Sequence, residues 1–235
     1  MKKVIHKASS RGYANHGWLQ SYHTFSFARY YNPERMNFGM LRVLNDDIVQ
    51  PNMGFGTHPH KNMEIISIPI SGALSHKDSM NNKRAIEVGE IQVMSAGSGI
   101  THSEFNDSKT EETNFLQLWI LPEEENVTPY YNQKEFPEAE RKNKLQVIVS
   151  PRTNAIEGSL VVYQQAFLYL ADLDENVTID YNLKNSAYIF LIEGEIAVAN
   201  ETLQNRDAIG ISNTKKITIK ANKKSKLLLI DVPMK

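Results

Sequence analysis

The sequence predicts an all-β fold built from two β-barrels in tandem. Short runs rich in Ile, Val, Leu, Tyr and Phe recur at close intervals, and clusters of turn-forming residues separate them. The block 64–95 and the block 188–212 also resemble each other in their order of apolar, glycine and charged residues. Repetition of one pattern within a chain is typical of a duplicated unit. Helical periodicity is weak throughout, so helices contribute little to the expected fold.

The expected strands fall into two groups. In the first half they are 40–44, 63–70, 90–94 and 115–121, and in the second half 145–149, 167–170, 177–180, 187–192 and 227–232. Asparagine, glycine and charged clusters predict turns at 45–47, 80–82, 97–99 and 222–224.

A connector is expected between the two groups, over residues 122–143. This stretch has an acidic run at 123–125, three prolines and few aliphatic residues. A short helix is expected over 136–143, with Pro137 in its first turn. We therefore predict a first barrel over residues 1–135 and a second barrel over residues 136–235.

The composition excludes several classes of protein. With 41% hydrophobic and 23% charged residues the chain is neither disordered nor fibrous. Its 26 basic and 27 acidic residues leave no basic excess for direct nucleic-acid binding. No apolar stretch is long enough to span a membrane, and we expect a cytoplasmic protein without a membrane partner. Cysteine is absent, so histidines and carboxylates are the remaining ligands for a metal.

The segment Gly54-Phe55-Gly56-Thr57-His58-Pro59-His60 is the most informative one. Alternate residues of a strand point to the same face, so the side chains of His58 and His60 should converge. Pro59 cannot donate a hydrogen bond to a neighbouring strand, which favours an edge strand or the start of a strand. With seven histidines in the chain, such a pair is weak evidence by itself.

A second segment, Ser95–Glu104, supplies a matching pair. After the turn at Gly97 and Gly99, the side chains of His102 and Glu104 should share one strand face. Three imidazoles and one carboxylate suit Fe(II), Mn, Ni, Cu(II) or Zn. The alternative is a group of polar residues inside a barrel, satisfied by hydrogen bonds or water.

Three further features of the sequence bear on this site. If the strand runs straight, Glu64 has the parity of the histidines and could accept the second N–H of a ligand histidine. His76 is interpreted as an exposed histidine near a hairpin. The alternation of His23, Phe25 and Phe27 is interpreted as strand core, with the mouth of a pocket as the alternative.

The motifs GFGTHPHKNMEIISIPISG and MSAGSGITHSE, preceded by RGYANHGWLQSYHTFSFARYYNPERMNFG, resemble the pirin branch of the cupin superfamily. The resemblance implies a bicupin, two antiparallel jelly-roll-type barrels facing each other. It also implies one divalent metal ion, foremost Fe(II) with Zn, Mn, Ni or Cu as alternatives. The pirin metal motif maps onto His58, His60, His102 and Glu104, so Glu104 ranks above Glu64 as the ligand.

The resemblance further implies a quercetin 2,3-dioxygenase type of activity on a small flavonol-like substrate and dioxygen. Glu104, the basic member of the ligand set, would accept the proton of the flavonol. The alternative is an iron-dependent, redox-sensing binding partner of a transcription regulator, without turnover. No histidine follows His102, and counting by analogy places Asp180 and Asn182 in the second barrel, so one metal per chain is expected.

Overall fold

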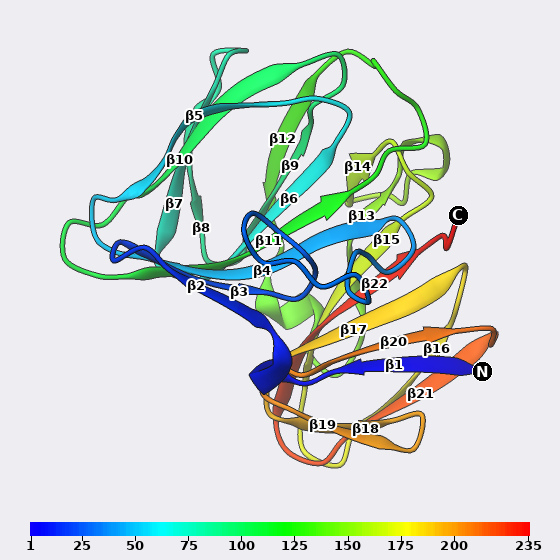
Figure 1. Ribbon diagram of the computed structural model, residues 1–235. Coiled ribbons are helices and arrows are strands. Elements are labelled where there is room, and N and C mark those ends of the chain that lie inside the picture. Colours follow the sequence, from blue (N-terminus) through cyan, green and yellow to red (C-terminus); the bar gives the residue numbers. More distant parts are fainter.

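The computed structural model describes residues 1–235 and shows two β-barrels side by side (Figure 1). Each barrel combines a seven-stranded sheet with a four-stranded sheet. Each of the nine expected strand segments overlaps an observed strand, with ends that differ by one residue in places, which confirms the predicted all-β fold with two barrels in tandem. Three single 3₁₀ turns, Ala8–Ser10, Glu138–Glu140 and Arg152–Asn154, are the helical elements.

The first barrel holds strands β2 to β12. Its large sheet has the order β12 (Tyr130–Glu135), β9 (Glu90–Ser95), β6 (Glu64–Ser71), β11 (Thr113–Ile120), β4 (Leu41–Val49), β3 (Leu19–His23) and β2 (Gly12–Asn15). Its small sheet has the order β5 (Gly54–His60), β10 (Ile100–Asn106), β7 (Ala73–Asp78) and β8 (Lys83–Glu87).

The second barrel repeats this arrangement. Its large sheet has the order β1 (Lys2–His6), β20 (Ala208–Ser212), β17 (Ser186–Glu193), β22 (Ser225–Val232), β15 (Phe167–Leu173), β13 (Gln146–Pro151) and β14 (Leu160–Val162). Its small sheet has the order β16 (Thr178–Asn182), β21 (Lys216–Ala221), β18 (Glu195–Val198) and β19 (Glu201–Gln204).

The first strand of the chain belongs to the second barrel. Strand β1 pairs antiparallel with β20 along its whole length, from Lys2 opposite Ser212 to His6 opposite Ala208. In Figure 1 this blue strand lies among the orange strands of the second barrel, whereas β2 and β3 lie in the first. Residues 2–6 therefore pair outside the 1–135 segment expected to form the first barrel, and the chain crosses between the barrels at both ends of that segment.

Two expectations about local structure were wrong. Residues 45–47 form no turn but lie inside β4, where each of their buried polar side chains takes part in at least one hydrogen bond. The connector 122–143 contains the edge strand β12, which pairs with β9, and its expected helix is reduced to one 3₁₀ turn. A run of polar residues resembles a loop in sequence even where the fold supplies partners for them.

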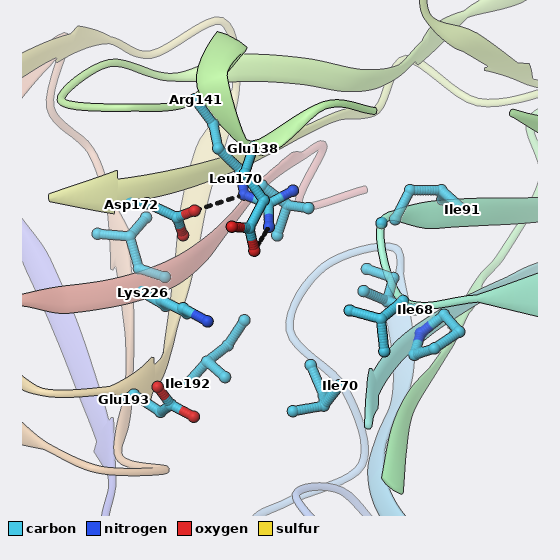
Figure 2. Close-up of a pocket in the computed structure, with 14 residues that line it drawn as sticks. Ile68, Ile70, Ile91, Glu138, Arg141, Leu170, Asp172, Ile192, Glu193 and Lys226 are labelled. Carbon is cyan, nitrogen blue, oxygen red and sulfur yellow. Dashed lines mark hydrogen bonds and ion pairs between the residues drawn. The ribbon is translucent and has the colours of Figure 1, made fainter. Parts of the chain in front are cut away.

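An apolar layer joins the two large sheets. One cluster of 26 buried residues combines side chains of the first barrel, such as Ile66 and Leu118, with side chains of the second, such as Leu168 and Ile230. At one edge of this layer a small hollow of about 50 Å³ lies between Ile68 and Ile91 on one side and Leu170 on the other (Figure 2).

Ion pairs close that edge of the layer. The guanidinium of Arg141, on the connecting segment, donates to Asp172 of β15 at 2.8 Å and to Glu138 at 3.0 Å, as Figure 2 shows. Arg141 is buried, so these charged hydrogen bonds satisfy a group that would otherwise be costly to remove from water. They fasten the connecting segment onto the second barrel.

The interiors of the two barrels differ in character. A cluster of 18 apolar residues fills the second barrel, and Asp180 and Asn182 point outward from β16 into solvent. Inside the first barrel the apolar clusters are small, with five and four residues, and polar side chains occupy the rest. Only the first barrel therefore has an interior suited to polar chemistry.

We expect Glu64→Gln to remove a pH-dependent cost of folding. Burial raises the pKa of Glu64 from 4.5 to about 7, against the opposing effect of hydrogen bonds from Ser95 and Tyr163. A carboxyl whose pKa is raised by folding stabilises the fold below its unfolded pKa, and this contribution is lost as the pH rises through the folded value. Relative to wild type, the variant should gain unfolding free energy between pH 4.5 and 7, by up to about 3 kcal/mol.

Urea denaturation of both proteins from pH 4 to pH 8 measures this difference. Glu124→Gln, which changes an exposed carboxylate, is the matched control and should track wild type at every pH. A Glu64→Gln difference that does not vary with pH would show that burial leaves this carboxyl unperturbed.

Candidate metal centre and adjoining cavity

Three histidines converge on the inner face of the small sheet of the first barrel. His58 of β5 lies opposite His102 of β10, and their ring centroids are 4.4 Å apart. His60 lies 4.8 Å from His58 and 4.9 Å from His102 by the same measure. The nearest ligand nitrogens of the three rings all lie within 4.8 Å of one another. Pro59 fits because β5 is the edge strand of this sheet, as expected.

Glu104 approaches the same centre from β10. The register of β10 against β5 shifts because β5 carries one extra residue between Phe55 and His58, whereas β10 runs in regular register along β7. One carboxylate oxygen accepts a hydrogen bond from Ser67 at 3.2 Å, and the other accepts one from Gln117 at 2.8 Å. Both donors come from the large sheet, which thereby fixes the carboxylate across the barrel.

The protonation state of these histidines suits a cation. Burial, reinforced by neighbouring imidazoles, lowers the pKa of His102 to about 3 and that of His60 to about 4. Both rings are therefore neutral at physiological pH and keep a lone pair for a ligand. His58 Nδ1 lies 2.8 Å from the carbonyl oxygen of Gly56, to which it donates a hydrogen bond. The other ring nitrogen, Nε2, is then available to bind a cation.

His102 gives the most direct indication that a cation belongs here. The side chain is buried, and neither of its ring nitrogens has a hydrogen-bond partner within the protein. Buried polar atoms are almost always satisfied, so an unpartnered imidazole indicates a missing ligand. The donor set of three imidazoles and one carboxylate therefore fits a divalent transition metal.

His76 was wrongly expected to be exposed. It is fully buried on β7, directly opposite Glu104 on β10, and its nearest ligand nitrogen lies within 4.8 Å of those of His102 and Glu104. Its Nε2 lies 3.2 Å from a carboxylate oxygen of Asp78, and its Nδ1 lies 3.3 Å from the side-chain amide of Gln92. With both nitrogens partnered, His76 differs from His102 and buttresses the centre.

Glu64 was placed incorrectly beside the histidines. Its carboxylate accepts hydrogen bonds from Ser95 at 2.6 Å and from the backbone N–H of Tyr163 at 3.1 Å, and from no histidine. Parity cannot be carried from His60 to Glu64, because the chain leaves the small sheet after β5 and bends at Asn62, where φ is 49°, before entering the large sheet. Glu64 instead shares its strand face with the apolar layer between the barrels.

A cavity of about 290 Å³ adjoins the histidines. Four of its six apolar lining residues are aromatic, and Trp119 lies edge-on to His60 with the ring centroids 4.9 Å apart. Its polar lining is formed by Ser21, His23, Asn45, Asp47, Glu104 and Gln117. His23 and Phe27 line the cavity, as the pocket-mouth interpretation of segment 23–27 expects. Phe25 lies in the apolar core, as the strand-core interpretation expects.

Sequence reasoning missed most of this lining. Asn45 and Asp47 were assigned to a turn, and the tryptophans Trp18 and Trp119 were not considered. The available signal was the largely apolar stretches on both sides of residues 45–47, 41–44 before and 48–49 after, which a continuous strand would join.

Comparison with known proteins places the chain. Residues 4–120 match the family Pirin, and residues 147–232 match the quercetinase C-terminal cupin domain. A quercetin 2,3-dioxygenase of Escherichia coli (strain K12) is 43% identical over 231 residues, which cover 97% of this chain and 98% of that protein. The chain belongs to the pirin family.

Other pirin relatives agree with this assignment. A pirin-like protein of Caulobacter vibrioides is 40% identical and aligns over 94% of this chain and 95% of its own. The structure of the bacterial pirin YhhW of Escherichia coli in complex with nickel(II) superimposes with a TM-score of 0.93 at 40% identity, covering 99% of both chains. This pirin therefore has the bicupin fold and belongs to a family in which a metal complex is known. No helix of its structure is long and apolar enough to cross a membrane.

We expect one equivalent of metal or less per chain in protein purified without chelator, because His58, His60 and His102 converge on one point and Glu104 lies beside His102. The double variant His58→Ala/His60→Ala should lose most of this metal, because two imidazoles leave the set. Mass spectrometry of digested protein for transition metals gives the count.

His16→Ala is the matched control, since His16 lines the cavity outside the ligand set and its loss should leave the count unchanged. Two reproducible equivalents in wild type, or an unchanged count in the double variant, would contradict the assignment.

Proposed function

We propose that this pirin opens a flavonol such as quercetin with dioxygen, releasing carbon monoxide. Membership in the family, with relatives named quercetin 2,3-dioxygenase, supports the class of a quercetinase-like oxidoreductase. The observation that carries the substrate proposal is the cavity, in which aromatic walls and hydrogen-bonding groups adjoin the histidine cluster. A flat, hydroxylated aromatic molecule matches that combination.

His58, His60, His102 and Glu104 would hold the cation, and we propose Fe(II) for it. Neutral imidazoles leave the site with a net positive charge that favours an anionic ligand such as a flavonol enolate. When bound, the cation lowers the pKa of a substrate hydroxyl and supplies the redox chemistry that dioxygen requires.

Glu104 is proposed to accept the proton of the flavonol hydroxyl. Its carboxylate is buried, Gln117 donates to one of its oxygens, and the Ser67 hydroxyl, which Glu104 shares with Gln117 Oε1, lies 3.2 Å from the other. Because Gln117 also lines the cavity, it can turn its amide toward a protonated Glu104 and accept the new O–H. The pair thus provides a defined place for the proton near the substrate.

The aromatic residues orient the substrate and exclude water. Trp119 packs edge-on against His60 and against Phe27, at centroid distances of 4.9 and 5.3 Å. Trp18 packs edge-on against Phe55 at 5.2 Å. These two pairs give the cavity rigid flat walls, which bind an aromatic ring at a small cost in side-chain entropy. Dioxygen then adds to the heterocyclic ring, which opens with loss of carbon monoxide.

We expect Glu104→Gln to retain metal but to lose turnover. The amide oxygen can still coordinate, and Gln117 can rotate its own amide to remain paired, but the amide cannot act as a base. Loss of a general base typically lowers the rate by about 10²–10⁴-fold. Loss of flavonol absorbance and release of carbon monoxide should be followed on wild type and variant preparations of equal metal content.

Metal-loaded Glu104→Gln with unchanged turnover would reject Glu104 as the base. Metal-loaded wild type without turnover on any flavonol would reject the dioxygenase and favour the redox-sensing binding partner.

A further inference from the structure

We propose that Asp47 binds a substrate hydroxyl at the side of the cavity formed by the large sheet and thereby selects polyhydroxylated aromatic substrates. The inference rests on the proposed function and adds a specificity-determining residue to it.

Asp47 lies on the sheet opposite the histidine-bearing one. Strand β4 carries Asn45 and Asp47 on its inner face, and β3 carries Ser21 and His23 opposite them. The histidines and Glu104 come from the small sheet, so the cavity lies between two polar surfaces. A ligand that reaches the histidine cluster from this cavity therefore passes the surface formed by β3 and β4.

Asp47 has one committed oxygen and one free oxygen. The hydroxyl of Ser21 donates to Oδ1, and the backbone carbonyl of Asp47 accepts from the amide of Asn114 at 3.0 Å. The hydrogen bonds of Asp47 within the protein go to Oδ1 and to the backbone carbonyl, which leaves Oδ2 available at the cavity that this 3% exposed residue lines. The free oxygen is thus an acceptor that only a molecule in the cavity can satisfy.

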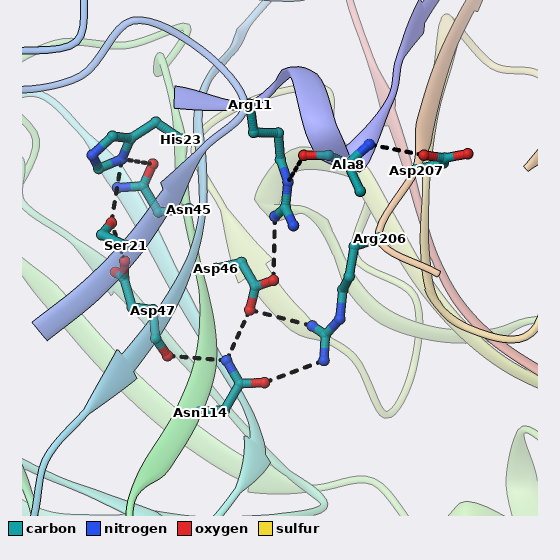
Figure 3. A network of polar contacts seen from close by, with 10 residues as sticks. All are labelled: Ala8, Arg11, Ser21, His23, Asn45, Asp46, Asp47, Asn114, Arg206 and Asp207. Carbon is teal, nitrogen blue, oxygen red and sulfur yellow. Dashed lines mark hydrogen bonds and ion pairs between the residues drawn. The ribbon is translucent and has the colours of Figure 1, made fainter. Parts of the chain in front are cut away.

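The two neighbouring arginines bind the preceding residue, Asp46, and not Asp47 (Figure 3). Arg11 donates to Asp46 at 3.2 Å, and Arg206, from the second barrel, donates to it at 3.3 Å. Asn114 also donates to Asp46 at 2.8 Å and accepts from Arg206 at 3.3 Å. Side chains alternate along a strand, so Asp46 takes these charges on the outer face while Asp47 faces inward with no cation.

A buried carboxyl without a cation is costly to maintain. Burial raises the pKa of Asp47 to about 7, and the charges of Asp46 and Glu104 act in the same direction against the hydrogen bond from Ser21. Near neutral pH this carboxyl can therefore accept a hydrogen bond or donate one. Arg11 and Arg206 bind Asp46 on the other face of the strand, so they do not offset this cost.

The chemistry of the wall identifies the ligand group. A phenolic hydroxyl donates to a carboxylate oxygen, whereas a ligand lacking that hydroxyl would leave Oδ2 desolvated and unpaired. Sites built to hydrogen-bond a hydroxyl discriminate strongly against analogues that lack it. Quercetin carries hydroxyls beyond the flavonol 3-hydroxyl, and 3-hydroxyflavone carries only that one, so the pair isolates the contribution of Asp47.

Calorimetric titration of the metal-loaded protein with each flavonol, in the absence of dioxygen, tests the inference by binding alone. The measured quantity is the ratio of the two dissociation constants, 3-hydroxyflavone over quercetin. Asp47→Ala should lower this ratio by about 10–100-fold, because only quercetin loses a hydrogen bond to a charged acceptor. Asp46→Asn, a change in the adjacent carboxylate on the other face, should leave the ratio at the wild-type value even if stability falls.

A second variant guards against failure to fold. Asp47→Asn keeps the shape and the bond to Ser21, and its weaker acceptor should still lower the ratio by several-fold, roughly tenfold at most. An unchanged ratio in either folded variant overturns the role of Asp47.

The dioxygenase proposal is tested separately by admitting air. Binding that depends on Asp47 without turnover would reject the dioxygenase but keep the hydroxyl site. Turnover with an unchanged ratio would keep the dioxygenase and reject the hydroxyl site at Asp47. If neither flavonol binds to wild type, both the dioxygenase and the hydroxyl site are rejected.

Discussion

The apolar layer between the two large sheets is the feature on which the rest of the structure depends. It draws buried side chains from both barrels, including Ile66 and Leu118 from the first and Leu168 and Ile230 from the second. Because each buried apolar side chain contributes roughly 1.5–3 kcal/mol, this layer and the apolar interior of the second barrel supply most of the burial. The first barrel is thereby free to hold polar groups and a cavity in its interior.

The second barrel thus supports the first in a direct physical sense. Its own interior is packed with aliphatic side chains, and its Arg206 reaches the first barrel to clamp Asp46 on the back of the cavity wall. Strand β1 adds a further connection, since the chain begins in the second barrel before forming the first. No histidine follows His102 in the chain, and the apolar core of the second barrel fills the space that a polar cavity would need.

The sequence was most informative where local spacing fixes geometry. Alternation along a single strand placed His58 beside His60 and His102 near Glu104, and the turn at Gly97 and Gly99 marked the start of the strand that carries His102 and Glu104. It failed where the outcome depends on pairing across sheets. The expected position of Glu64 assumed a straight strand, but the chain bends before Glu64, and Ser95 binds its carboxylate. His76 was expected to be exposed near a hairpin, but Asp78 and Gln92 supply buried partners for its ring. Residues 45–47 resemble a turn, and only partners distant in sequence make them strand residues.

The central claim is that one cation held by His58, His60, His102 and Glu104 adjoins the cavity in which the flavonol binds. A crystal structure of the protein with Fe(II) and quercetin, obtained without dioxygen, tests it most directly when anomalous diffraction is collected at the iron edge. The account predicts a single anomalous peak within coordination distance of these four side chains and the flavonol between the aromatic walls and Asp47. An anomalous peak in the second barrel, or quercetin bound outside this cavity, would contradict it.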